Sequence, residues 1–445
     1  MTSARQERTR SSGWWALAPA CLGYFFVLLD VTVVNVALAN MGSDLGTSRD
    51  GLQWVVDAYA LVLASLMLSA GDVGDLVGRR RVFVTGLLAF GVSSVICAVA
   101  PSVGVLVAGR ALQGLGAAAI LPTSLAIINH AFADSDERTK AIGFWAALGS
   151  LALVAGPLAG GALVDSLGWR AIFWLNLPLV VIAAALTMSL VAESSDPGER
   201  RIDVRGQVFA VGLLAGLVFF LIEGGRLGWT VPPVVSALAV AVVSAFVFIR
   251  TERRRRDPML QLGYFQNATF SAANAGSGLM NLGTLGALFA FSIYLQQDQG
   301  ESPIEAGLHI LPWTAGLAVF AILGGRIAQT LGPRLPAGLG LAMTGIAFVV
   351  VAILPSQTGA AALIALGFAG IGLGIATPAL VSAATEAVPA PRAGMAAAVN
   401  NTARQAGGAI GVALIGAIGA IQAAMAVAGG VVLLGGALGL SLIRD

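Results

Sequence analysis

The sequence predicts an all-α polytopic membrane protein with fourteen transmembrane helices, arranged as two six-helix bundles plus two additional central helices. Three observations support this class: a low content of charged residues, many long apolar runs, and an internal repeat. Of the 445 residues, 57% are hydrophobic and 11% are charged, whereas soluble domains carry roughly 25% charged residues. Apolar runs of about 20 residues match helices that cross ~30 Å of hydrocarbon. β-Barrel strands would instead read as short alternating segments.

Fourteen runs have the length and composition of membrane helices. Residues 335–385 carry no charge, and Pro355 and Gly359 supply the break that divides this run into two helices. The tail 405–443 is also free of charge and must hold most of two helices, with the break near residues 420–423. The expected spans are 14–39, 51–70, 82–100, 104–130, 141–164, 171–191, 207–222, 232–249, 268–295, 305–328, 335–354, 359–383, 393–418 and 421–442.

Basic residues predict the orientation of these helices. With both termini in the cytoplasm, the inside segments collect twenty of the 25 Lys and Arg residues, and the outside segments hold only Arg49, Arg170 and Arg226. This asymmetry follows the positive-inside rule and requires an even number of helices. The basic residues before residue 11 lead into an apolar run that continues past any plausible cleavage site. The first helix is therefore expected to remain as an anchor.

An internal repeat predicts two related halves. The pattern Gly71-x3-Asp75-x2-Gly78-Arg79-Arg80 is echoed 254 residues later, at residues 325–334. A second pattern, Gly-x-Gly followed by Pro122, returns 256 residues later with Pro378. The near-equal offsets predict six-helix bundles at residues 1–192 and 258–445, with cytoplasmic linkers and two inserted helices at 193–257. Bundles that face each other in this way are typical of transporters with a midplane site.

Ionisable residues inside the predicted helices indicate the functional site. Arg110 lies between residues 82–109 and 111–133, which carry no charge, and Asp30 is the only acidic or basic residue of 11–43. An unpaired charge in a bilayer costs at least ~3 kcal/mol, so each should have a partner and a purpose. Asp57 and Arg404 are further candidates for proton coupling or substrate contact. A purely structural role, in which Asp30 only fixes helix packing through Asn35 or Thr32, remains an alternative.

Five short motifs with fixed spacing lie in order along the chain. They are LDVTVVNVAL at 29–38, GDVGDLVGRRR at 71–81, GRALQGLGA at 109–117, GPLAGG at 156–161 and GWRAIFWLNLP at 168–178. Together they resemble the major facilitator superfamily, and within it the fourteen-helix drug:proton antiporters. Leu76 departs from the family pattern, which usually has a basic residue there, and Asn40 stands where a proline often closes the first motif.

The resemblance, together with the chemistry of the residues, assigns expected roles. A gating loop at the inner surface comprises Gly71, Asp75, Gly78, Arg79 and Arg80. An antiporter helix, whose small residues permit close helix approach and whose proline bends it, contains Gly156, Pro157, Gly160 and Gly161. Polar and aromatic residues that could line a drug pocket, although such aromatics also commonly face lipid, are Trp54, Tyr59, Gln113, Trp145, Phe289 and Tyr294.

These observations predict proton-coupled efflux of lipophilic, cationic drugs or antibiotics across a bacterial cytoplasmic membrane, by alternating access. The proton motive force would drive it, with no cofactor, metal or nucleic acid, since the chain lacks a Gly-x4-Gly-Lys-Ser/Thr phosphate loop and has only two His and two Cys. We expect a monomer in the lipid bilayer. An importer or facilitator of a metabolite on the same scaffold is the alternative, and a membrane-embedded sensor or enzyme is a more remote one.

Overall fold

Helices make up almost all of the chain. The computed structural model describes residues 2–132, 134–196, 203–255, 260–389 and 392–444, and within these ranges there are fourteen α-helices and no strand. The helices are α1 (Thr2–Leu45), α2 (Arg49–Val77), α3 (Arg79–Ala98), α4 (Val103–Ala131), α5 (Ser135–Leu167), α6 (Ala171–Leu190), α7 (Val204–Leu227), α8 (Pro232–Arg254), α9 (Ala268–Ile293), α10 (Pro303–Leu331), α11 (Arg334–Ile353), α12 (Ala360–Glu386), α13 (Ala393–Gly416) and α14 (Ile421–Leu442). A 3₁₀ turn (Leu262–Gln266) precedes α9, and a π-helical turn (Tyr294–Asp298) follows it.

The fourteen predicted helices are therefore confirmed, although several are longer than the sequence indicated. Helix α2 continues to Val77 and α5 begins at Ser135, because helical structure extends past the hydrocarbon into the polar loops. The last break falls before Ile421, slightly earlier than expected. Thirteen of the described helices are long and apolar enough to cross a membrane. Helix α13 falls short of that standard because it carries a polar stretch, Asn400 to Gln405.

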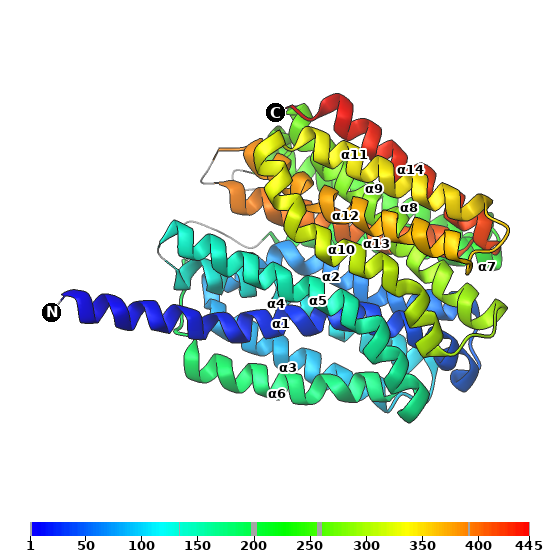
Figure 1. Ribbon diagram of the computed structural model, residues 1–445, viewed down its shortest axis with the longest axis horizontal. Helices are drawn as coiled ribbons and strands as arrows, with labels where there is room; N and C mark the ends of the chain where they lie inside the picture. The colour runs from blue at the N-terminus through cyan, green and yellow to red at the C-terminus, as the bar shows by residue number, and fades with distance from the viewer. Residues whose placement is uncertain (1, 133, 197–202, 256–259, 390–391, 445) are drawn as a thin grey trace.

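The helices form two bundles that lie side by side, α1–α6 and α9–α14 (Figure 1). The pairs of helices that pack together repeat between the bundles with a shift of eight helices. For example, α1 packs on α5 as α9 packs on α13, and α3 packs on α4 as α11 packs on α12. Across the interface, α5 meets α10 and α2 meets α13, which are again equivalent pairs. The second half of the chain therefore repeats the helix packing of the first.

The repeat extends to individual glycines. A Cβ atom added at Gly116 of α4 would lie 2.8 Å from the carbonyl oxygen of Gly86 in α3. A Cβ atom added at Gly372 of α12 would lie 2.4 Å from the carbonyl oxygen of Gly340 in α11. These are the same helix crossings in the two halves, and both require glycine because the backbones are nearly in contact. The echoed glycines of the sequence therefore mark conserved geometry within this one chain.

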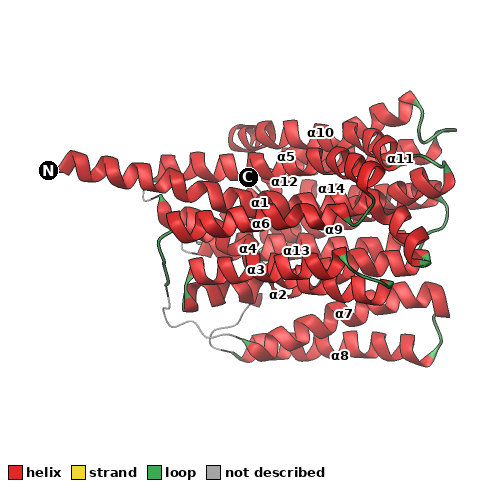
Figure 2. Cartoon of the chain, turned by 90° about the horizontal axis from the view of Figure 1, so that it is seen from below, coloured by secondary structure: helices red, strands yellow, loops and turns green. Residues whose placement is uncertain are grey.

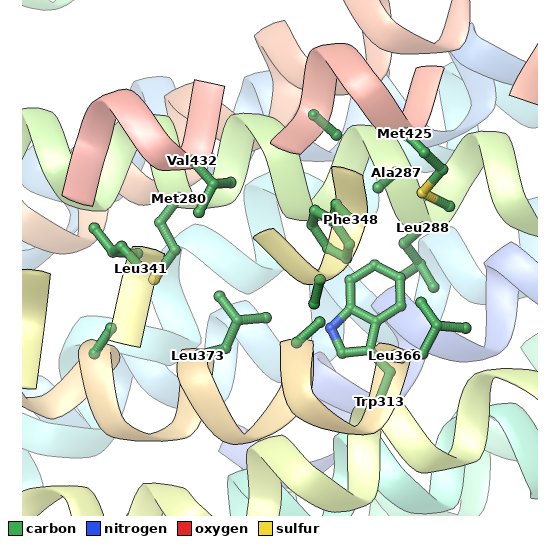
Figure 3. Packing of buried hydrophobic residues seen from close by; sticks show 14 of the residues in the cluster. Met280, Ala287, Leu288, Trp313, Leu341, Phe348, Leu366, Leu373, Met425 and Val432 are labelled. Carbon is green, nitrogen blue, oxygen red and sulfur yellow. The ribbon is translucent and has the colours of Figure 1, made fainter. Parts of the chain in front are cut away.

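Each bundle has its own apolar core. In the second bundle Trp313 and Phe348 meet edge to face with ring centroids 5.1 Å apart, and Leu288 and Leu366 lie beside them (Figure 3). Met280 and Leu341 belong to the same cluster, farther along it. The corresponding core of the first bundle is built around buried phenylalanines of α1 and α3. A third cluster, which includes Leu29 of α1 and Phe289 of α9, spans the interface between the bundles.

Helices α7 and α8 pack on each other along one edge of the molecule (Figure 2), and α7 also packs on α2. Near one end of α7, the Gln207 amide donates to the carbonyl oxygen of Ser65 at 2.6 Å and bonds to Ser69. Near the other end, Glu223 accepts from the Trp54 indole at 2.9 Å. Polar contacts at both ends of α7 therefore fasten this helix to the first bundle, while it also touches α13.

Candidate functional site

A buried ion pair lies inside the first bundle. Arg110 of α4 is 1% exposed and Asp30 of α1 is 3% exposed, and Nη1 of Arg110 lies 2.5 Å from Oδ2 of Asp30. The two residues are far apart in the sequence and meet because α1 and α4 pack together. The pair cancels the two charges that the bilayer would otherwise penalise.

Further polar groups satisfy the remaining atoms of this pair. Nη1 of Arg110 also donates to Oε1 of Gln113 at 2.8 Å, and its Nε donates to the carbonyl oxygen of Val55 at 3.2 Å. The amide of Asn176 donates to Oδ1 of Asp30 at 3.1 Å. Ser94 accepts from the amides of both Gln113 and Asn176, at 2.8 and 3.3 Å. Five helices, α1, α2, α3, α4 and α6, thus converge on one network.

Tyr59 covers the arginine of this network. Its ring centroid lies 4.3 Å from the guanidinium carbon of Arg110, which is a cation–π arrangement. The ring can approach because Gly114, one turn beyond Arg110, lies against the backbone of α2: a Cβ atom there would be 2.5 Å from the carbonyl oxygen of Tyr59. Asn35 and Thr32, the alternative partners of Asp30, instead donate to carbonyls of their own helix.

Asp57 of α2 is in the opposite situation. It is 0% exposed, and neither carboxylate oxygen has a hydrogen-bond partner among the described residues. One turn earlier on the same helix, the Gln53 amide donates to the carbonyl oxygens of Val412 and Ala413 in α13, at 3.0 and 3.3 Å. Residues four apart share a helix face, so Asp57 belongs to the face of α2 that is directed to the second bundle. An ionised carboxylate without partners costs far more there than a protonated one.

Arg404 of α13 is a second membrane arginine with a different environment. It is partly buried, forms no ion pair with any described residue, and its Nε has no acceptor. The next residue along α13, Gln405, lines the small cavity between the bundles. Arg404 makes no contact with Asp30 or Arg110 in their network of hydrogen bonds.

A small cavity lies between the bundles beside this network. Its volume is about 30 Å³, room for one water molecule and far less than the ~300–1,000 Å³ of a drug-sized site. Its polar wall comes from Asn35, Tyr59 and Arg110 of the first bundle and Gln405 of the second. The structure therefore represents a closed form, in which the bundles must separate before a large molecule can enter.

The predicted aromatic residues do not share one pocket. Tyr59 lines the cavity, and Gln113 lies behind it in the ion-pair network. Trp54 faces Glu223 of α7, and Phe289 is buried in the interface core with α1 and α2. Tyr294 lies on the π-helical turn and bonds to Gln357 at 3.3 Å. Trp145 stacks on Tyr24, with ring centroids 3.7 Å apart.

The antiporter helix α5 touches both bundles through its small residues. A Cβ atom added at Gly156 would lie 1.8 Å from the Thr32 hydroxyl of α1, and one added at Gly160 would lie 2.8 Å from Val36 of the same helix. A Cβ atom added at Gly161 would lie 2.7 Å from the carbonyl oxygen of Pro303 at the start of α10. Pro157 lies inside α5, and its carbonyl oxygen would be 2.4 Å from a Cβ atom on Gly307 of α10. Gly161 and Gly307 therefore permit close contact between the bundles at the predicted outer end, whereas Gly156 and Gly160 pack α5 on α1 within the first bundle.

Gly161→Val is expected to lower substrate exchange at least about tenfold while the protein still folds, because the added methyls force α5 and α10 apart where the backbones meet. Gly143→Val is the matched control, since a Cβ atom at Gly143 on the same helix meets nothing within 4 Å. Counterflow of labelled substrate in vesicles measures the effect. Equal rates for the two variants would contradict a role for this seam.

The predicted gating loop is mostly helical: Gly71 and Asp75 belong to the end of α2, Arg79 and Arg80 begin α3, and only Gly78 lies between the two helices. Gly78 adopts φ 121°, which side chains rarely tolerate, and its neighbour Arg79 pairs with Asp75 at 2.8 Å. The Arg80 backbone amide donates to Glu193 at 3.0 Å, and the Arg79 amide donates to the Ser194 carbonyl at 2.9 Å. These contacts join the loop to the segment after α6, within the first bundle. Gly71 lies against Pro122 of α4, where a Cβ atom would be 3.6 Å from that ring.

Sequence reasoning missed several members of the network. Ser94 and Asn176 are not among the residues that the sequence indicates, although Asn176 lies in the motif at 168–178. Serine and asparagine occur at many positions in these helices, so only proximity in three dimensions identifies the relevant ones. The short motif spacing around Arg110 and Gln113 was informative because both residues lie on α4, three positions apart.

Comparisons with known proteins give a consistent result. Residues 20–412 match the model of the Major Facilitator Superfamily. The chain is 37% identical over 397 residues to the multidrug resistance protein Stp of Mycobacterium tuberculosis, covering 89% of this chain and 74% of Stp. It is 36% identical over 398 residues to a methylenomycin A resistance protein of Streptomyces coelicolor, covering 89% of this chain and 83% of the relative. It is 35% identical over 419 residues to the puromycin resistance protein pur8 of Streptomyces alboniger, covering 91% and 81%.

Solved structures share the fold at low sequence identity. A peptide transporter POT crystal structure has a TM-score of 0.72 at 16% identity, covering 96% of this chain and 93% of its own. The human organic anion transporter MFSD10 has a TM-score of 0.68 at 15% identity, covering 96% and 99%. At these identities the likeness concerns the arrangement of helices alone.

Proposed function

The chain belongs to the Major Facilitator Superfamily, and we propose that it is a proton-coupled exporter of lipophilic, cationic drugs or antibiotics. Its relatives at about 35% identity carry names of multidrug or antibiotic resistance proteins. Both termini would lie in the cytoplasm of a bacterial cell, since that orientation places the basic segments inside. The proton motive force is the energy source, with no bound cofactor.

The observation that carries this proposal is the contrast between the two buried carboxylates. Asp30 is paired with Arg110 and accepts hydrogen bonds on both of its oxygens. Asp57 has neither a counter-ion nor a hydrogen-bond donor, so in this closed form it is the carboxylate that holds a proton. It also belongs to the helix face at the bundle interface, where alternating access changes its exposure.

The transport cycle follows from this assignment. When the bundles open to the outside, a proton binds Asp57 and allows the neutral side chain to be buried as they close. When they open to the inside, water reaches Asp57, the proton leaves, and the carboxylate attracts a lipophilic cation. The Asp30–Arg110 pair keeps α1, α4 and α6 in register and holds Tyr59 at the cavity wall. Proton and cation compete for one carboxylate, which is the minimum requirement for exchange.

This mechanism predicts how transport responds to each component of the driving force. Exchange of one proton for one monovalent cation moves no net charge, so a pH difference of one unit should support about tenfold accumulation of rhodamine 123 in proteoliposomes. A potassium diffusion potential without a pH difference should support none. Flux that follows only the rhodamine gradient, with no proton movement, would indicate a facilitator and contradict the proposal.

A further inference from the structure

Gln53 of α2 is a buried amide that joins the two bundles. Its side chain is 0% exposed, and Nε2 donates to the carbonyl oxygens of Val412 and Ala413 of α13, at 3.0 and 3.3 Å. Ala413 belongs to the last turn of α13, which ends at Gly416, and carbonyls of a last turn lack a donor from their own helix. Gln53 therefore caps the end of α13 and closes the seam between α2 and α13 at the predicted outer end.

The equivalent seam of the repeat is closed in a different way. Gly307 has the position in α10 that Gln53 has in α2, 254 residues earlier in the chain. There the backbones themselves meet, because a Cβ atom on Gly307 would lie 2.4 Å from the carbonyl oxygen of Pro157 in α5. A seam held by backbone contact opens only when the helices move, whereas a seam held by an amide side chain also opens when that side chain turns.

The other end of this amide is unused. Oε1 of Gln53 is buried and has no hydrogen-bond partner among the described residues, and the same is true of both carboxyl oxygens of Asp57. Asp57 lies one turn after Gln53 on the continuous helix α2 and is 0% exposed. Side chains four positions apart on a helix are neighbours, and glutamine bonds to an acidic side chain at this spacing. The free atoms of the two side chains can therefore satisfy each other.

Other charged side chains do not bond to Asp57. In the membrane part of the helices that pack on α2, these are Asp30 of α1, Arg110 of α4, Glu223 of α7 and Arg404 of α13. None of the four, and none of the arginines that begin α3, bonds to either oxygen of Asp57. The amide of Gln53 is therefore the polar group within one helical turn that can respond to a proton on Asp57.

We propose that Gln53 transmits the charge of Asp57 to the seam between α2 and α13. When Asp57 holds a proton, its O–H donates to Oε1 of Gln53, and the amide N–H groups stay on the carbonyls of α13. When the proton leaves, the carboxylate is a stronger acceptor than a carbonyl, and it attracts these N–H groups away from α13. Gln53 is thus a positioning residue, and its role rests on the export function proposed above, in which Asp57 carries the proton.

This link gives the exchange its order. A proton taken up from outside directs the Gln53 amide to α13, so the predicted outer seam closes and the bundles can open to the inside. Loss of the proton to the cytoplasm weakens that seam, so the form that has bound its cation can open to the outside. The next proton from outside displaces the cation and restores the seam.

Electron–electron resonance distances between two spin labels test the link. The labels are attached through Ser48→Cys and Ala420→Cys, exposed positions that precede α2 and follow α13. The full chain is studied in phosphatidylcholine nanodiscs at about pH 5 and about pH 9, which bracket the titration of many buried carboxyls. Between these two conditions, the ratio of outer-open to outer-closed molecules should rise about three- to tenfold in the otherwise unchanged chain. Asp57→Asn should keep the outer-closed form under both conditions.

Gln53→Met, which has a similar length but no polar atom, should favour the outer-open form equally at both pH values. Ser292→Ala is the matched control, since Oγ of Ser292 in α9 also donates across the interface, to the Asn35 carbonyl at 2.6 Å. It should shift the ratio equally at both pH values and leave the pH response intact. If Gln53→Met does not fold, Gly416→Ala replaces it, because a Cβ atom there would lie 2.5 Å from Nε2 of Gln53 and displace the amide from α13.

A pH response of full size in Gln53→Met, or in Gly416→Ala where that variant replaces it, overturns the link. Absence of a pH response from the otherwise unchanged chain also overturns it. The proposed export function is decided by a separate measurement, the accumulation of rhodamine 123 in vesicles with a pH difference. Normal proton-driven accumulation, together with a pH response that does not depend on Gln53, would refute the link alone.

Discussion

Asp57→Asn is expected to abolish proton-driven accumulation of rhodamine 123, so that the accumulation ratio falls from about tenfold per pH unit to one. Asparagine has nearly the same shape as a protonated aspartate but cannot lose a proton. Because Asp57 has no hydrogen-bond partner among the described residues, the substitution breaks no contact and should not lower the thermal stability. The permanently neutral side chain still permits the bundles to close.

Counterflow, which needs no proton gradient, distinguishes a defect in proton coupling from a general loss of transport activity. Asp57→Asn should retain measurable counterflow of a substrate that does not depend on its charge for binding. Asp50→Asn provides the matched control, because Asp50 lies in the first turn of the same helix and is partly exposed. That variant should accumulate rhodamine as the wild type does. Normal pH-driven accumulation by Asp57→Asn would remove Asp57 as the proton carrier.

The sequence predicted the fold more completely than it predicted the candidate site. Long apolar runs and the two offsets of the repeat predicted fourteen helices in two bundles, because lipid forces every backbone group into a helix. Isolated charges in these runs also singled out Asp30, Asp57 and Arg110. The sequence could not distinguish the two carboxylates, since both look like single acids in apolar helices. Only the packing of α1 on α4 shows that Asp30 is paired and Asp57 is not.

The aromatic residues and glycines illustrate why the rest needed three dimensions. Trp54 and Tyr59 are five positions apart on α2, and the helix turns them toward different neighbours, α7 and Arg110. Glycines are abundant throughout the chain, so their sequence positions alone do not show which ones touch another backbone. Gly161 does so and Gly143 does not, although both lie on α5.

The Asp30–Arg110 pair gives the second large expected effect. Arg110→Gln should lower the free energy of unfolding by about 3–5 kcal/mol, because it leaves the Asp30 carboxylate buried without its counter-ion. Asp30→Asn should cost a similar amount, since it leaves the guanidinium uncompensated. Thermal unfolding of the purified variants in detergent measures both losses of stability. Losses of similar size are expected if the two side chains stabilise the fold mainly through each other.

The double variant Asp30→Asn with Arg110→Gln distinguishes a packing role of the pair from a coupling role. Neither charge remains in it, and the amides can still bond to Asn176 and Ser94, so most of the lost stability should return. If Asp57 alone carries the proton, the double variant also keeps pH-driven accumulation within a few fold of the wild type. A stable double variant that exchanges substrate but cannot couple it to protons would move the coupling role back to Asp30 and Arg110. In that case the primary role of the Asp30–Arg110 pair would be proton transfer, and its contribution to helix packing would be secondary.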